Sequence, residues 1–292
     1  MFQYSSNNIK IILTYFIFLI SAGVATFVIN KFKLPQWAIY MVLFVLAFIY
    51  QFTLSYNVSF TGDSDLQFLF YNATDLTEGI FLSPNLYCAT FPGTVTYPAV
   101  LARLMTIFGV GRMVPVILNH VVICTLSCCS YAFLKHRMPP SWALCGGFMV
   151  ALHPFAILYS NTCNAEIIFG SLMLFSLFSF IKASRAFSDK ERLLWLTVTA
   201  FLCGFSTLFR PLAVVMVIAY TLYIVFFIME IWWKKLFVIT ELILVLLLFG
   251  LVNNAIVKSI TAYDPPANSY GWNLYAKRFY LYHNYGIHPS NP

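Results

Sequence analysis

The chain has 292 residues, of which 61% are hydrophobic and only 9% are charged, and its mean hydropathy is +0.81. A water-soluble domain carries about a quarter charged residues, so this composition excludes a soluble globular protein and indicates an integral membrane protein. The formal net charge of +7 does not indicate nucleic-acid binding, because the basic residues occur in short clusters between apolar runs.

The apolar runs predict an all-α fold, because a helix needs about 20 apolar residues to cross the hydrocarbon core. We expect a bundle of about eight transmembrane helices, at residues 11–30, 36–56, 113–134, 141–160, 165–181, 193–209, 212–229 and 236–257. Glu241 lies near one end of the last run, from which its side chain is expected to reach water. His120 lies inside the third run and is expected to hydrogen-bond a neighbouring helix.

The basic residues in the connections between these runs predict the orientation of the bundle. Ten lysines and arginines fall in alternate short connections, and they are Lys31, Lys33, Lys135, Arg137, Lys182, Arg185, Lys190, Arg192, Lys234 and Lys235. Basic loops stay in the cytoplasm, so both termini and the remaining connections are predicted to be external. These external parts are the first loop, 57–112, the turns at 161–166 and 209–211, and the tail, 258–292.

The first external loop contains two segments that are expected to be helical. In Asp65–Glu78 the apolar residues recur at helical spacing, and Pro98–Gly109 begins with proline and ends with glycine but is too short to span a membrane. We expect two interfacial helices that lie along the membrane surface. A loop that collapses onto the bundle is the alternative.

Asp63 and Asp65 form the first candidate for chemistry. Carboxylates two residues apart beside a long apolar run are costly at a membrane unless they serve a purpose. They suit a catalytic base, a metal ligand, part of a proton path, or a simple solvated loop. Glu166 is the second candidate, and a stabilising charge at a helix N-terminus is its alternative explanation.

Arg210 is the third candidate, because it interrupts a long apolar stretch and Pro211 follows at once. A guanidinium fixed at the membrane surface matches the phosphate of a lipid carrier in charge and geometry. Ordinary lipid headgroups are the alternative partner.

Several motifs, taken in order, resemble the GT-C membrane glycosyltransferases. The first loop carries Asp65, Ala73, Leu76 and Gly79, followed by Tyr97-Pro98 and Ile107-Phe108-Gly109. Later matches are Arg112, Asn119, Pro154, Tyr159, Glu166, Gly204, Arg210-Pro211 and Gly271-Trp272-Asn273-Leu274-Tyr275. The most similar branch, of family 39 type, includes the protein O-mannosyltransferases, the aminoarabinose transferase of lipid A and many bacterial cell-envelope enzymes.

The resemblance implies a GT-C-type helical bundle whose active site lies at the outer surface of the plasma membrane, or of the endoplasmic reticulum membrane in a eukaryote. Such enzymes move one sugar from a polyprenyl-phosphate donor to a glycan, lipid or protein acceptor, usually with inversion. By position, Asp65, with Asp63 beside it, becomes the catalytic base. Arg210, with Arg103 or Arg112, becomes the phosphate-binding group. Glu166 orients the acceptor or a divalent cation, Mg²⁺ or Mn²⁺, and the need for a metal stays open.

The domain organisation expected from these observations is one GT-C-like transmembrane module, 1–257, followed by the tail, 258–292. This tail is rich in Tyr, Asn, Pro and Gly, and we expect it to begin a further region or to be completed by a partner subunit. A second hypothesis is therefore a non-catalytic subunit of a larger envelope complex. A transporter is a third, although transport sites lie near the middle of the membrane rather than at one surface.

Overall fold

The computed structural model describes residues 8–57, 65–80, 95–153, 156, 159–210, 212–228 and 231–261. Within these ranges the chain is helical and contains no strand, so the predicted all-α membrane fold is confirmed. Asp63 and most of the predicted tail lie outside the described residues.

The described helices follow the apolar runs of the sequence. Their bounds are α1 Asn8–Phe32, α2 Gln36–Asn57, α3 Asp65–Thr77, α5 Thr96–Phe108, α6 Met113–Leu134, α7 Pro140–Ala151, α9 Ala165–Arg185, α10 Asp189–Thr207, α11 Ala213–Tyr223, the π-helical segment η2 Ile224–Ile228, and α12 Trp232–Thr261. Five of them, α1, α2, α6, α9 and α12, are long and apolar enough to cross a membrane. A further long helix, α10, has charged residues in its first turn, while α7 and α11 are shorter apolar helices.

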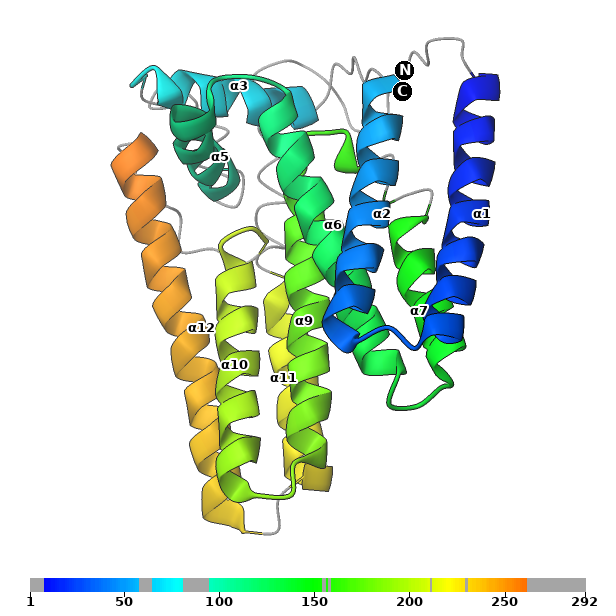
Figure 1. Ribbon diagram of the computed structural model, residues 1–292. Helices are drawn as coiled ribbons and strands as arrows, with labels where there is room; N and C mark the ends of the chain where they lie inside the picture. Colours follow the sequence, from blue (N-terminus) through cyan, green and yellow to red (C-terminus); the bar gives the residue numbers. More distant parts are fainter. Residues whose placement is uncertain are drawn as a thin grey trace, which may run out of the picture.

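The long helices pack in two groups that meet where α6 contacts α9. In one group, Leu43 and Tyr50 of α2 pack against Tyr131 of α6, together with side chains of α1 and α7. In the other, Phe180 of α9 and Leu196 of α10 share a core with residues of α11 and α12. Figure 1 shows both groups running in roughly the same direction, with α3 lying across one end and α5 slanting down below it.

The two ends of the bundle differ in character. We name the end that carries α3 and α5 the interfacial end, and the opposite end, where α1 meets α2, α6 meets α7 and α9 meets α10, the basic end (Figure 1). All ten basic residues predicted to be cytoplasmic lie in or next to the connections of the basic end. The sequence therefore sorted the connections correctly between two opposite ends.

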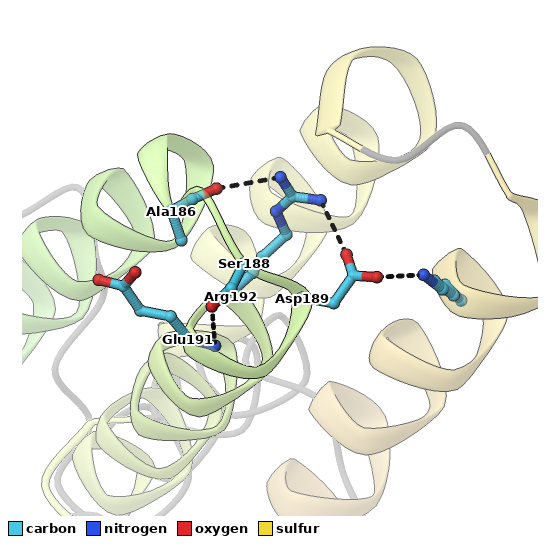
Figure 2. Close-up of polar contacts among 6 residues, drawn as sticks. Ala186, Ser188, Asp189, Glu191 and Arg192 are labelled. Atoms are coloured by element: carbon cyan, nitrogen blue, oxygen red, sulfur yellow. Dashed lines mark hydrogen bonds and ion pairs between the residues drawn. The ribbon is translucent and has the colours of Figure 1, made fainter.

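A polar cluster ties α10 to α12 at the basic end. The Asp189 carboxylate accepts hydrogen bonds from Lys234 and, at 3.5 Å, from Arg192. Arg192 also donates to the carbonyl oxygen of Ala186, 3.1 Å away, and Ser188 caps the helix by accepting from the Glu191 backbone N–H (Figure 2). The ammonium of Lys234 holds the pKa of the exposed Asp189 carboxyl below its usual value.

Close contact between α10 and α12 requires a glycine. A Cβ atom added at Gly204 would lie 2.5 Å from Phe249 Cδ2 and 2.8 Å from Val245 Cγ1. Such distances are far shorter than van der Waals contact, so any larger residue requires the side chains of Phe249 and Val245, or the two helices, to move.

Two details differ from the sequence-based expectation. The fourth predicted span is shorter than 141–160, because α7 ends at Ala151; His153 precedes Pro154, and a residue before proline disfavours the helical conformation. Glu241 does not reach the end of the bundle, because α12 begins at Trp232, about 13 Å of helix earlier at about 1.5 Å per residue. Its Oε2 atom is buried and has no hydrogen-bond partner among the described residues.

The expectation for His120 is confirmed. Its Nε2 atom lies 2.8 Å from the Ser55 hydroxyl of α2. The same hydroxyl oxygen lies 2.8 Å from the Gln51 carbonyl oxygen within α2.

Candidate active site

Two short helices cover the interfacial end of the bundle, as the sequence predicts. In α5, Tyr97, Leu101 and Met105 recur every fourth residue and are fully buried, and Gly109 ends the helix with a φ of +89°. Their buried side chains share a core with Ala73 of α3. The same core includes Cys163, Ile168 and Phe209, so the covering helices rest on the segments that carry Glu166 and Arg210.

Glu166 and Arg210 form an ion pair at this end. The Arg210 Nη2 atom donates to Glu166 Oε1 over 2.6 Å, although 44 residues separate the two in the sequence. Glu166 lies in the first turn of α9, and Arg210 directly follows the last turn of α10, where its backbone N–H bonds Ser206. The Arg210 side chain is 35% exposed and the Glu166 side chain 52%, so both remain open to a ligand.

Asn164 holds the other side of the Glu166 carboxylate. As the N-cap of α9, its side-chain oxygen accepts from the Glu166 backbone N–H at 2.8 Å. Its amide nitrogen donates to Glu166 Oε2 at 3.3 Å. Glu166 thus does place a negative charge in the first turn of a helix, as its alternative explanation required. The same carboxylate is also oriented between the Asn164 amide and the Arg210 guanidinium.

Asp65, Arg103 and Arg112 lie at the same end of the bundle. Asp65 is the first residue of α3, and its side chain, like all of Asp63, lies outside what the structure describes. Arg103 and Arg112 are exposed, the first on α5 and the second just before α6. The ion pair that the described residues show at this end joins two of the predicted site residues, Glu166 and Arg210.

A buried phenol and thiol belong to the same core as Ile168 and Phe209. Tyr97 is fully buried beside Cys163, and its hydroxyl makes no hydrogen bond of normal geometry to a described residue. Burial raises the pKa of the Cys163 thiol to about 12, and it raises the pKa of the Tyr97 phenol well above its usual value. Burial therefore disfavours the anionic form of both groups, and neither is assigned as the base.

Sequence reasoning overlooked Gln51. It is fully buried in α2 and bonds both the end of α7 and the segment before α9. Its signal was a lone amide inside the apolar run 36–56, where a polar side chain needs a partner. No group of three or more His, Cys, Asp or Glu side chains gathers among the residues that the structure describes.

Comparison with known protein families identifies the family of this chain. A family model described as dolichyl-phosphate-mannose-protein mannosyltransferase matches residues 93–253, more than half of the chain. The chain belongs to this family. The match runs from just before α5 into α12 and includes Glu166 and Arg210, whereas Asp63 and Asp65 precede it.

Membership of the mannosyltransferase family confirms the resemblance read from the motifs at the level of the family. It makes the chain a multi-pass membrane protein of a family of glycosyltransferases that use lipid-linked sugars. No curated protein and no solved structure matches the chain significantly.

Proposed function

We propose that this protein transfers a sugar from a polyprenyl-phosphate donor, undecaprenyl or dolichyl, to an acceptor at its interfacial end. The observation that carries the proposal is the ion pair of Glu166 with Arg210, half-exposed at the end where Asp65 begins α3. Family membership supports the donor class, and the ion pair supports the location of the reaction.

The reaction needs a base and an anion-binding group, and both residue types are present at this end. The acceptor hydroxyl oxygen attacks the anomeric carbon of the sugar while the bond from that carbon to the phosphate oxygen breaks, which inverts the configuration. The hydroxyl proton passes to the Asp65 carboxylate. The negative charge left on the lipid phosphate is stabilised by Arg210, assisted by the exposed Arg103 or Arg112.

Glu166 is assigned to the acceptor. Its carboxylate lies 2.6 Å from a guanidinium nitrogen, and a Mg²⁺ or Mn²⁺ ion beside that guanidinium would meet like-charge repulsion. A sugar or peptide hydroxyl can instead donate to the half-exposed carboxylate without disturbing Arg210. We therefore give Glu166 the acceptor-orienting role and derive no step through a metal.

The orientation in the membrane is part of the proposal. Ten lysines and arginines gather at the basic end, which the positive-inside rule assigns to the cytoplasm. The interfacial end then faces outward, at the surface of the plasma membrane or the lumen of the endoplasmic reticulum. Among family members, the cell-envelope branch fits this arrangement, with a glycan, lipid or protein as acceptor.

Replacing Asp65 with Asn tests the proposed function. The variant keeps the shape of the side chain but removes the base, and we expect sugar transfer to fall about 10²- to 10⁴-fold while expression and thermal unfolding stay unchanged. Glu78→Gln is the matched control, since Glu78 is an exposed carboxylate just beyond the same helix. Normal turnover by Asp65→Asn would disprove the base. Indifference to changes at Asp63 and Glu166 as well, together with a stoichiometric partner, would favour a non-catalytic subunit.

A further inference from the structure

Two buried amide side chains, Gln51 of α2 and Asn119 of α6, hold the chain segment that leads to Glu166. Both side chains are fully excluded from solvent. The segment in question, residues 159–164, connects the region after α7 to the first turn of α9. We propose that Gln51 and Asn119 are positioning residues of the active site, acting through this segment on the Glu166–Arg210 ion pair; the inference rests on the proposed function.

Asn119 supplies two hydrogen bonds to the backbone of the segment. Its amide nitrogen donates to the carbonyl oxygen of Thr162 at 2.9 Å and to that of Ser160 at 3.3 Å. Both amide hydrogens of Asn119 are thereby used. One side chain of α6 thus holds two backbone carbonyl groups of the segment.

Gln51 ties the same segment to the end of α7. Its amide nitrogen donates to the Ala151 carbonyl oxygen at 2.6 Å, and its own oxygen accepts from the Ser160 hydroxyl at 3.0 Å. Ala151 is the last residue of α7, so its carbonyl has no partner within that helix. Gln51 replaces that missing bond and sets the distance between the end of α7 and the start of the segment.

The constraint reaches Glu166 through a short buried stretch. Thr162, Cys163 and Asn164 are all buried, with exposures of 8%, 8% and 2%. Asn164 then bonds both the backbone N–H and the carboxylate of Glu166. Any shift of the Thr162 carbonyl is therefore passed on to the carboxylate over only four residues, in packing too tight to absorb it.

The geometry also explains why amides occupy these positions. Each amide donates to a backbone carbonyl oxygen inside the bundle, where such a group needs a hydrogen-bond partner. An apolar side chain of equal size would fill the space without fixing the carbonyls. An acid would place oxygen atoms against carbonyl oxygens and push the segment away.

The test compares two variants of Asn119 with a matched control on the same helix. Asn119→Ala removes both donors, and Asn119→Asp keeps the volume but turns donors into acceptors. Thr125→Ala is the control, because the exposed Thr125 hydroxyl bonds only the carbonyl of Val121 within its own helix. A small displacement of a reacting group costs up to about 100-fold in rate. We therefore expect kcat to fall about 10- to 100-fold in both Asn119 variants, while KM for the donor changes by less than about threefold. Thr125→Ala should leave both kcat and KM unchanged.

Combination with Glu166→Gln separates positioning from general structural damage. If Asn119 acts through Glu166, then Asn119→Ala lowers kcat in the native background but not further in the Glu166→Gln background. Equal loss in the two backgrounds would overturn the inference. If Asn119→Ala fails to fold, Ser160→Ala, which removes the hydroxyl bond to Gln51, is carried through the same cycle with the same two outcomes.

Hydrogen exchange keeps the inference distinct from the proposed function. We expect Asn119→Ala to raise amide exchange at least about tenfold across 159–166, and Thr125→Ala to leave it unchanged. Activity that is insensitive to Glu166→Gln would disprove the role proposed for Glu166 while the exchange result still reported on the segment. Unchanged exchange in Asn119→Ala would overturn the positioning role whatever the activity shows.

Discussion

Replacing Arg210 with Gln should separate donor binding from folding. The ion pair with Glu166 is 35% exposed on the arginine side and 52% on the glutamate side. Half-exposed pairs contribute about 0–1 kcal/mol to stability, so the free energy of unfolding should fall by less than about 1 kcal/mol. Loss of a charge-assisted hydrogen bond to phosphate costs about 1.5–3 kcal/mol.

That second cost corresponds to a fall in kcat/KM for the lipid donor of about 10- to 150-fold, at about 1.4 kcal/mol per factor of ten. The assay follows transfer of a labelled sugar by the purified protein in lipid nanodiscs at varied donor concentration, alongside thermal unfolding. Arg137→Gln is the control, since Arg137 is an exposed arginine at the basic end. An unchanged kcat/KM in folded Arg210→Gln, or an equal fall in Arg137→Gln, would refute the phosphate-binding role.

Two further predictions concern the contacts between α10 and α12. Gly204→Ala should destabilise the protein by about 1–3 kcal/mol in thermal or denaturant unfolding, because the added Cβ lies 2.5 Å from Phe249 Cδ2 and overpacks the contact between α10 and α12. The ion pair of Asp189 with Lys234 should stabilise the protein at neutral pH and lose its effect in acid. The pKa of Asp189 is lower in the folded protein, so this stabilisation exists above the ordinary aspartate pKa and disappears as pH falls through the lowered value.

Each of these predictions has a matched comparison. Gly170, inside α9, has no atom within 4 Å of an added Cβ, so Gly170→Ala should be neutral or stabilise by up to about 1 kcal/mol. Equal destabilisation by both alanines would contradict the packing argument for Gly204. For Asp189, the difference in melting temperature between the native protein and Asp189→Asn should shrink toward zero on acidification. A constant difference across that range would show that the carboxylate charge is not the cause.

Much of the fold follows from the sequence because the bilayer imposes its own regularities. Apolar runs of about 20 residues must be helical to satisfy their backbone, and helices were found at each predicted run. The proline at the start of the short segment 98–109 and the glycine at its end were enough to predict α5, and the structure shows that Tyr97, Leu101 and Met105 form its buried face. The basic residues of the connections identified one end of the bundle.

The details that escaped prediction depend on contacts between distant parts of the chain. The pairing of Glu166 with Arg210 joins residues 44 apart, and only the packing of α9 against α10 brings them within 2.6 Å. Gln51 bonds residues about 100 positions away, which no local pattern reveals. Glu241 was misplaced because α12 continues through Trp232 and the lysines that follow, beyond the apolar run that defined the predicted span.

A structure of the protein bound to a non-reactive polyprenyl-phosphate sugar analogue would test the central claim most directly. Our account predicts that the phosphate lies at the interfacial end within hydrogen-bonding distance of the Arg210 guanidinium, with the sugar between it and the start of α3. A phosphate bound among the lysines and arginines of the basic end, remote from Arg210, would contradict it.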